Sequence, residues 1–301
     1  MQTRQLGTDG PEVSAIGLGA WPIGGGMGEV DREVAVETIR TAIDSGITLL
    51  DTAQAYRTSE NVVGDALKDG YRERCFLATK VSGRYSPKDI RSAIENSLKQ
   101  LDVEYVDLYQ VHSWNPAFRI EQTMETMAKL QEEGKTRYIG VSNFNAEQMY
   151  QALQTTRFQS SQPRYNLFDR EIESVDIPFC GEEGIGILVH SPLAKGLLTG
   201  RYAPGHTFPE GDERAQMKRF RGDLFTRYIE TAERIRDEVA EPKGISMVQC
   251  AIAWILRHPE VTSVLVGAKN ADQVKEHVGA AEISFEDDER ERIEVILTQA
   301  P

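Results

Sequence analysis

Short apolar segments alternate with longer amphipathic segments along most of the chain. The apolar segments are rich in Val, Ile and Leu, which is typical of strands buried on both faces of a parallel sheet. Eight of them predict strands, at residues 15–20, 47–50, 75–78, 105–111, 137–141, 158–161, 185–189 and 261–266. Three of the amphipathic segments predict helices that begin with a capping residue or an early proline, at Asp31, at Ser86-Pro87 and at Asn145. Helices are expected to stop at Gly46, Gly70 and Gly134.

The ends of the predicted strands recur at regular distances. The steps from residue 20 to 51, 80, 112, 142, 162 and 190 are 31, 29, 32, 30, 20 and 28 residues. Because a strand–helix unit takes about 30 residues, this spacing predicts one such unit repeated along the chain. Strands that alternate with helices form a parallel sheet, and either a closed barrel or an open doubly wound sheet could hold them.

Three segments lie outside this repeat. Residues 1–14 contain the turn signal Thr8-Asp9-Gly10-Pro11 and predict a small hairpin that closes the bottom of a barrel. Residues 191–262 contain a Gly- and Pro-rich loop at 203–221, followed by helices predicted at 226–240 and 246–257. Residues 286–298 predict an additional helix. Since no segment has the composition of a linker, residues 1–301 are expected to form a single α/β domain.

Charge and composition narrow the class of partner. With 47 acidic and 34 basic residues the formal net charge is −13, which argues against nucleic acid and against an anionic membrane surface. The three widely spaced cysteines show no pairing pattern, and no apolar segment approaches the length of a membrane span, so a cytoplasmic protein is expected. No H-x-x-x-H or C-x-x-C spacing occurs, so no metal site is expected.

Polar residues end six successive apolar segments. They are Asp51, Lys80, His112, Ser142, Gln162 and His190. In a parallel barrel these positions surround the C-terminal end, where catalytic groups gather. A dinucleotide-binding doubly wound sheet is disfavoured, because the segment Gly17-Leu18-Gly19-Ala20-Trp21-Pro22 lacks the third glycine of the G-x-G-x-x-G fingerprint.

Several motifs together resemble those of the aldo-keto reductases. The Asp and Tyr of Leu50-Asp51-Thr52-Ala53-Gln54-Ala55-Tyr56, the Lys of Ala78-Thr79-Lys80-Val81 and the His of Tyr109-Gln110-Val111-His112 match the catalytic residues of that family. The similarity continues through residues 139–144, 191–200 and 267–273, in the family's order and over nearly the whole chain. It is compatible with a bacterial-type member and with the branch of the potassium-channel β subunits.

The resemblance implies a fold and an activity. The expected fold is a (β/α)8 TIM barrel with an N-terminal β-hairpin and a C-terminal extra helix. The expected activity is the NADPH-dependent reduction of an aldehyde, ketone or sugar carbonyl by hydride transfer, with Tyr56 as proton donor. Because a tyrosine pKa is ordinarily about 10, we expect the Lys80 ammonium to lower the pKa of Tyr56. Asp51 would hold Lys80 in place, and His112 would orient the carbonyl.

The resemblance also implies where the cofactor and the substrate bind. The residues matched to cofactor contacts are Ser142, Asn143 and Gln162 at the nicotinamide carboxamide; His190, Ser191, Pro192, Leu193, Lys195 and Gly196 around the nicotinamide ring and pyrophosphate; and Gly267, Lys269, Gln273 and Glu276 around the 2′-phosphate and adenine. Lys269 would pair with the 2′-phosphate, which favours NADPH over NADH. Trp21 and Trp114 are expected to line the substrate site.

Two positions depart from the family pattern. His190 stands where many members have a tyrosine that stacks on the nicotinamide, and His277 stands where an asparagine is usual. An imidazole has an ordinary pKa of about 6.5, so a stacked His190 is expected to gain charge just below neutral pH. That charge would weaken the binding of the cationic oxidised cofactor.

Two other functions remain open at this stage. A lysine at a strand end also suits a barrel lyase in which Lys80 forms a Schiff base with its substrate. A non-enzymatic cofactor-binding regulatory subunit, as among the potassium-channel β subunits, is the other alternative, although the complete set of catalytic residues argues against it.

Overall fold

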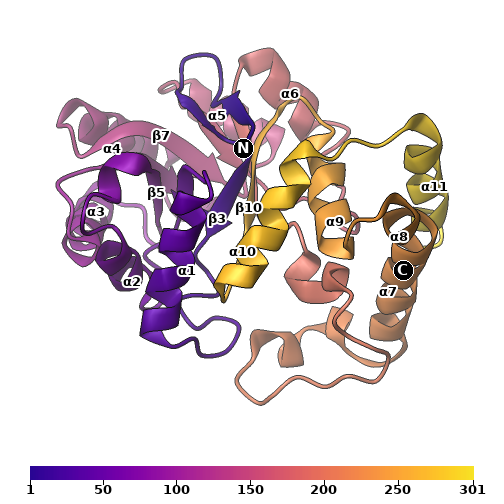
Figure 1. Ribbon diagram of the computed structural model, residues 1–301. Helices are drawn as coiled ribbons and strands as arrows, with labels where there is room; N and C mark the ends of the chain where they lie inside the picture. Colours follow the sequence, from indigo (N-terminus) through magenta and orange to yellow (C-terminus); the bar gives the residue numbers. More distant parts are fainter.

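Eight parallel strands close into a barrel, and the computed structural model describes all residues 1–301 (Figure 1). The strands are hydrogen-bonded in the closed order β10-β3-β4-β5-β6-β7-β8-β9. Their bounds are β3 Ile16–Gly19, β4 Leu49–Asp51, β5 Phe76–Val81, β6 Val106–Val111, β7 Thr136–Ser142, β8 Ser160–Gln162, β9 Gly186–Val189 and β10 Val261–Val266. The predicted barrel is therefore confirmed, and the open doubly wound sheet is wrong.

Helices surround the barrel. They are α1 Arg32–Asp44, α2 Ser59–Ala66, α3 Pro87–Leu101, α4 Ile120–Glu132, α5 Ala146–Leu153, α6 Asp176–Glu183, α7 Gly222–Ile235, α8 Glu241–Lys243, α9 Met247–Leu256, α10 Ala271–Val278 and α11 Asp287–Leu297. The three predicted helix starts are confirmed, because the side chains of Asp31, Ser86 and Asn145 each accept hydrogen bonds from the first turn of their helix.

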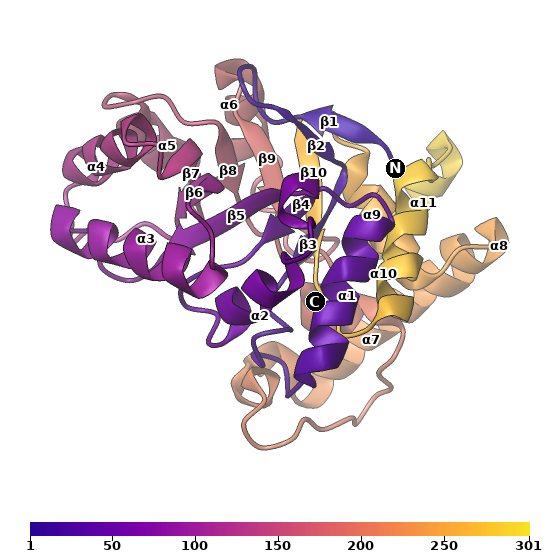
Figure 2. The same ribbon diagram turned by 60° about the vertical axis from the view of Figure 1, so that its left-hand side comes forward.

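The C-terminal third departs from the simple repeat. The helix predicted at 226–240 begins earlier, at Gly222, and a π-helical segment, Arg236–Ala240, carries it into α8. The extra C-terminal helix is confirmed as α11, which packs beside α7 outside the barrel (Figure 2). Residues 203–221 form a long connection with two short 3-10 helices, Glu213–Gln216 and Lys218–Phe220.

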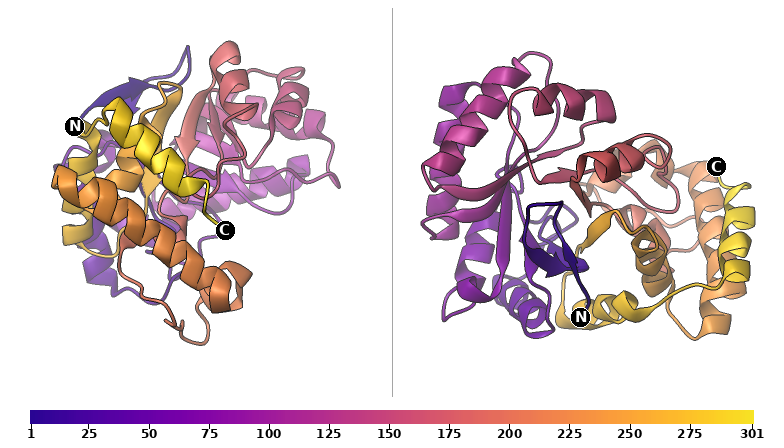
Figure 3. Two further views of the ribbon diagram at one scale, coloured as in Figure 1. Left: turned by 90° about the vertical axis from the view of Figure 1, so that its right-hand side faces the viewer. Right: turned by 90° about the horizontal axis from the view of Figure 1, so that it is seen from above.

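The N-terminal hairpin closes one end of the barrel. Strands β1 (Thr3–Gln5) and β2 (Glu12–Ser14) pair antiparallel and lie over the barrel axis when the molecule is seen from that end (Figure 3, right). Leu6 and Val13 are fully buried against inward-facing side chains that include Leu49, Leu108 and Leu265. Hydrophobic burial thus makes the hairpin a plug for the bottom of the barrel, as predicted.

The inside of the barrel changes from apolar to polar along its axis. Side chains two residues apart on a strand point to the same side. Leu49, Ala78 and Leu188, in the apolar layer at the hairpin end, therefore share the barrel interior with the polar strand ends Asp51, Lys80 and His190, each two residues further on. The apolar hairpin end accordingly stabilises the barrel, and the opposite end carries the polar side chains that could act chemically.

We expect Leu6→Ala to lower the free energy of unfolding by about 2–5 kcal/mol, because it leaves a cavity in place of a fully buried side chain. Gln2→Ala is the control, since Gln2 is exposed next to β1. Equilibrium unfolding in urea measures both variants. Equal stability of Leu6→Ala and Gln2→Ala would contradict the role of Leu6 as a plug.

Candidate active site

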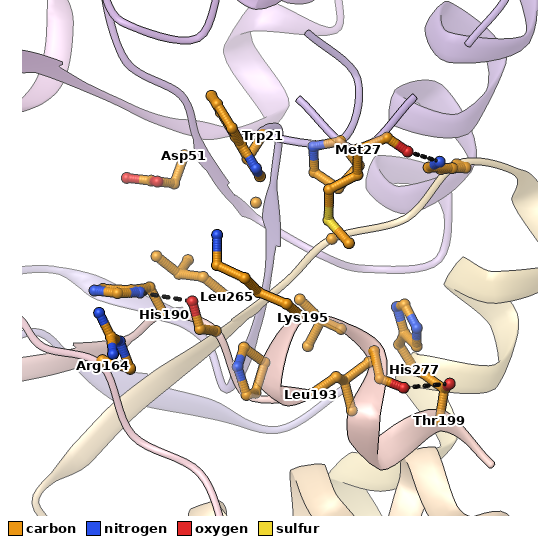
Figure 4. Close-up of a pocket in the computed structure, with 18 of the residues that line it drawn as sticks. Trp21, Met27, Asp51, Arg164, His190, Leu193, Lys195, Thr199, Leu265 and His277 are labelled. Atoms are coloured by element: carbon orange, nitrogen blue, oxygen red, sulfur yellow. Dashed lines mark hydrogen bonds between the residues drawn. The ribbon is translucent and has the colours of Figure 1, made fainter. Parts of the chain in front are cut away.

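A cavity of about 810 Å³ opens at the end of the barrel opposite the hairpin. Its wall includes the strand-end residues Asp51, Gln162 and His190, the loop after β3, and residues of the long connection after β9 (Figure 4). The loops at the C-terminal ends of the strands therefore enclose one continuous site, as is usual in parallel barrels.

A buried ion pair lies at the base of this cavity. Lys80 is fully buried, and its Nζ donates to Asp51 Oδ1 at 2.5 Å and to the Thr52 carbonyl at 2.9 Å. The same Nζ lies 3.3 Å from the hydroxyl of Tyr56, whose ring forms part of the cavity wall. Three residues from β4, the loop after it and β5 are thus joined around one ammonium group.

Burial and charge act in opposite directions on this group. Burial raises the pKa of Tyr56, and the Lys80 ammonium lowers it only in part, so the net shift is upward. The expectation of a lowered Tyr56 pKa is therefore wrong for this state, because desolvation outweighs the nearby charge. Burial alone would lower the pKa of Lys80, but Asp51 and Tyr56 more than offset it and the pKa is raised. A neutral phenol thus faces a charged ammonium.

Asp51 has two further partners. Its Oδ2 accepts from Gln162 Nε2 at 2.9 Å and from Gln110 Nε2 at 3.2 Å. Gln162 Nε2 also lies 3.2 Å from Gln110 Oε1, so the three side chains form a closed cluster inside the barrel. The Gln162 amide oxygen makes no hydrogen bond within the protein, although Gln162 lines the cavity. This oxygen is available to a bound ligand.

His112 stands against Tyr56 at the cavity wall, with the ring centroids 5.6 Å apart. Its Nδ1 lies 2.7 Å from the hydroxyl of Ser82, the first residue after β5. Burial and the Lys80 ammonium lower the pKa of His112 to about 3, so the imidazole is neutral at physiological pH. A Ser82 hydroxyl that donates to Nδ1 leaves the ring proton on Nε2, where it can donate to a ligand oxygen.

Asn143 is the centre of a second network of hydrogen bonds. Its Nδ2 donates to the His112 carbonyl and to Ser142 Oγ, both at 3.0 Å, and its Oδ1 lies 2.9 Å from His190 Nε2. The Ser142 hydroxyl itself donates to the Gln162 carbonyl at 2.9 Å. Asn143 and Gln162 line the cavity, but Ser142 does not, so Ser142 acts here as a support for Asn143.

His190 is held at both ring nitrogens, because Nδ1 lies 3.0 Å from the hydroxyl of Ser191. Burial, with the positive charges of Lys80 and Arg164, lowers the pKa of His190 to about 3. The expectation that His190 gains charge just below neutral pH is therefore wrong. A charged imidazole here would lose solvation and face two cations, so the ring remains neutral down to strongly acidic pH.

The segment after β9 folds tightly. Ser191, Ala194, Lys195 and Gly196 all have positive φ, so the 3-10 turns of Ala194–Thr199 are interrupted by a kink. Gly196 has φ +105°, and a Cβ there would lie 2.9 Å from the Tyr202 ring, so only glycine fits. Successive backbone N–H groups in such a turn form a concave site for anions.

The other end of the cavity contains the segment that follows β10. Asn270 caps α10, and Gln273 Oε1 accepts from the Lys269 backbone N–H at 2.9 Å, so the segment is fixed by its own helix. Lys269 Nζ donates to the Met27 carbonyl in the loop after β3. His277 is also part of the wall, and burial with the nearby Arg201 lowers its pKa to about 4.

Most of the predicted site residues meet at this cavity. Those that line it are Trp21, Asp51, Tyr56, His112, Asn143, Gln162, His190, Ser191, Pro192, Leu193, Lys195, Gly196, Gly267, Lys269, Gln273 and Glu276. Lys80 does not line the cavity but lies behind Asp51 and Tyr56. The prediction for Trp114 is not supported, because this side chain packs edge-on against Phe144 and lies outside the wall.

Other residues at the site were not among the predicted ones. Gln110 and Ser82 lie two residues from His112 and Lys80 respectively, so strand alternation could have indicated that they share a side with them. Met27, Arg201, Tyr202 and Arg214 reach the cavity from long loops, and only the folded chain brings them there.

The chain matches the sequence profile described as the aldo/keto reductase family over residues 15–298. It is 39% identical over 289 residues to the aldo-keto reductase YhdN of Bacillus subtilis, covering 91% of this chain and 87% of that protein. It is 34% identical to an NADH-specific methylglyoxal reductase of Escherichia coli, with 95% of each chain covered. This protein belongs to the aldo/keto reductase family.

The fold of this aldo/keto reductase also matches solved structures of the family. The glycerol dehydrogenase AKR11B4 from Gluconobacter oxydans superimposes with a TM-score of 0.88 at 32% identity, covering 99% of this chain and 95% of that one. As a member of the family, this protein is an oxidoreductase of the carbonyl-reducing type that uses a nicotinamide cofactor. None of its helices is long and apolar enough to cross a membrane.

We expect Ser82→Ala to release the tautomer of His112, because it removes the only side chain that bonds to Nδ1. Nitrogen NMR of histidine-labelled protein distinguishes a ring protonated at Nε2 from a mixture of tautomers. Ser82→Thr keeps the hydroxyl and should keep the wild-type signals, as should Ser113→Ala, which removes a neighbouring hydroxyl that faces Tyr85. If Ser82→Ala shows the same single tautomer as the wild type, Ser82 does not fix it.

Proposed function

We propose that this aldo/keto reductase is a cytoplasmic, single-domain NADPH-dependent reductase of aldehydes, ketones or sugars, with Tyr56 as proton donor. The observation that carries the proposal is the Lys80 Nζ, 3.3 Å from the Tyr56 hydroxyl and 2.5 Å from Asp51, at the base of a cavity of about 810 Å³. A neutral phenol beside a fixed ammonium suits the donation of a proton to a developing alkoxide.

The residues of this chain then act as follows. A bound NADPH would supply the hydride that the carbonyl carbon accepts. Tyr56 transfers its hydroxyl proton to the carbonyl oxygen, and the negative charge left on Tyr56 faces the Lys80 ammonium. Asp51 keeps that ammonium charged and in position. The alcohol thus carries one hydrogen from the cofactor on its carbon and one from Tyr56 on its oxygen. Tyr56 regains a proton from solvent before the next turnover.

His112 is proposed to orient the carbonyl. Its neutral ring stands against Tyr56, and an Nε2–H directed into the cavity can donate to the same oxygen that receives the proton. Trp21 lies edge-on to Tyr56, with ring centroids 4.9 Å apart, and supplies an apolar wall for the substrate. The phenol and the imidazole would thus converge on the carbonyl oxygen, and the Lys80 ammonium would face the phenol oxygen from behind.

The nicotinamide is proposed to bind beside Gln162, Asn143 and His190. The unpartnered Gln162 amide oxygen is an acceptor suited to the carboxamide N–H, and Asn143 is held next to it by Ser142 and His190. The neutral His190 ring can lie against the nicotinamide without charge repulsion in either oxidation state.

The cofactor phosphates are proposed to bind at the two loop segments. Ser191, Pro192, Leu193, Lys195 and Gly196 would surround the pyrophosphate, and Gly267, Lys269 and Gln273 the 2′-phosphate, with Glu276 near the adenine. Apart from Arg164 and Asp51 at the reactive end, the cavity wall carries the cations Lys195, Arg201, Arg214 and Lys269 against one carboxylate, Glu276, in a protein whose formal net charge is −13. Such a local excess favours a ligand with several phosphate charges, and Lys269 at the N-terminal end of α10 favours NADPH.

A lyase that uses Lys80 as a Schiff-base nucleophile fits the structure poorly. The side chain is fully buried, and Asp51, Thr52 and Tyr56 occupy its three donor directions. Its raised pKa also keeps the amine protonated, whereas a nucleophilic amine must be free of its proton.

Tyr56→Phe is expected to leave folding and NADPH binding intact and to lower kcat by about 10²–10⁴-fold, because only the transferable proton is removed. Reduction of a panel of aldehydes and ketones, followed by the loss of reduced-cofactor absorbance, measures the effect. Tyr71→Phe, which removes a hydroxyl on the outer surface, is the control. A kcat near that of the wild type would show that another group donates the proton.

Lys269→Ala should weaken NADPH binding by roughly ten- to a hundredfold and leave NADH binding nearly unchanged, since a charge-assisted bond to the 2′-phosphate is worth about 1.5–3 kcal/mol. Dissociation constants for both cofactors come from titration calorimetry. Lys275→Ala, on the same helix but outside the cavity, should change neither. Equal weakening of NADPH and NADH by Lys269→Ala would place Lys269 away from the 2′-phosphate.

A further inference from the structure

The five cations of the cavity wall differ in their partners. Lys195 pairs with Glu213 at 2.6 Å, Arg214 pairs with Asp212 at 2.7 Å, and Lys269 donates to the Met27 carbonyl. The side chains of Arg164 and Arg201 make no hydrogen bond or ion pair within the protein. Arg201 lies at the end of the cavity near His277. Arg164 is therefore a cation without a partner in the fold, and it lies apart from Arg201.

Arg164 lies at the reactive end of the cavity. It comes two residues after Gln162, and its backbone forms a parallel bridge with that of His190. Its charge is among those that lower the pKa of His190, so the two side chains are close. Figure 4 shows it beside His190, on the same side of the view as Asp51 and away from His277 and Thr199. It thus lies near the proposed hydride-transfer site and away from the segments proposed for the phosphates.

The nearby carboxylate is already occupied. Asp169 is close enough to feel the charge of Arg164, but Arg219 binds both of its oxygens, at 2.7 and 2.8 Å, and Asn166 binds one of them at 2.8 Å. Asp169 therefore has a bidentate cation of its own. Within the fold, the five N–H donors of Arg164 have no partner, and its exposed side chain forms part of the cavity wall.

We propose that Arg164 is a specificity-determining residue that binds a carboxylate on the substrate, so that the preferred substrates are aldehydes or ketones with an anionic group. The inference rests on the proposed reductase function and names its substrate class. A guanidinium matches a carboxylate in a planar, bidentate geometry. A protein of formal net charge −13 repels anions at long range, and an unpaired cation at the reactive end of the cavity compensates where binding occurs.

The test compares isosteric substrates that differ in charge. The probes are 3- and 4-carboxybenzaldehyde and the corresponding carbamoylbenzaldehydes, reduced with NADPH by the wild type and by Arg164→Gln. We expect the wild type to prefer at least one carboxylate over its amide in kcat/KM. Arg164→Gln should lower kcat/KM for that carboxylate about tenfold or more, the low end of a charge-assisted bond because the site is open to solvent. The amides should be reduced at an almost unchanged rate.

Two controls separate recognition from other effects. Arg164→Lys keeps the charge but not the planar fork, and should recover part of the preference. Arg119→Gln removes one positive charge from the loop before α4, outside the cavity, and should leave the carboxylate-to-amide ratio at the wild-type value. The NADPH dissociation constant of Arg164→Gln, measured without substrate, should match that of the wild type.

Three other outcomes would contradict the reductase function, the carboxylate site or the assignment of Arg164 to the substrate. If the wild type reduces no probe and no compound of a broad carbonyl panel, the proposed function fails. If it reduces the amides and carboxylates equally well, or if Arg164→Gln leaves their ratio unchanged, the function stands and the carboxylate inference fails. A weakened NADPH dissociation constant in Arg164→Gln would instead assign the guanidinium to the cofactor.

Discussion

The buried ion pair between Asp51 and Lys80 is the constraint on which the site depends. Removing an ammonium from water costs several kcal/mol, and that cost is offset only if its partners are close and fully hydrogen-bonded. Lys80 meets this condition through Asp51, the Thr52 carbonyl and Tyr56. Asp51 meets it in turn through Gln110 and Gln162. Loss of one partner would leave an uncompensated charge, at a cost of about 3–5 kcal/mol, so the pair that we propose to serve the proton transfer also fixes the neighbouring strands.

This requirement explains why the barrel is divided along its axis. Charged and amide groups can be satisfied inside the barrel only where several strand ends contribute partners at one level. The level below is apolar at Leu49, Ala78 and Leu188 and is closed by Leu6 and Val13 of the hairpin. The apolar plug excludes water from the underside of the ion pair, which strengthens every electrostatic interaction above it. Stability at one end of the barrel is thus a condition for chemistry at the other.

Much of this architecture could be predicted from the sequence, because it depends on local periodicity. The strand count, the helix starts at Asp31 and Asn145, and the hairpin follow from patterns within about 30 residues. The contacts between side chains from distant segments do not follow from such local patterns. Gln110 was visible only as part of a motif, and its bond to Asp51 spans 59 residues. The sign of the Tyr56 pKa shift depends on how burial compares with charge, and the edge-on contact of Trp114 with Phe144 is formed only in the folded chain.

The electrostatics of the cavity must be considered locally, because ionic screening limits the reach of surface charge to about 8–10 Å in physiological salt. The net charge of −13 therefore describes how the molecule repels anions at a distance, while the balance of five cations to two carboxylates describes the cavity wall itself. Behind the wall, Glu213 binds Lys195 and also accepts from Trp21, so its carboxylate offsets part of the positive charge at that end. A phosphate group that approaches Lys195 must compete with Glu213, whereas an anion that approaches Arg164 meets no internal competitor. The two ends of the same cavity are thus electrostatically distinct: one exchanges an internal ion pair for a ligand, and the other presents a free cation.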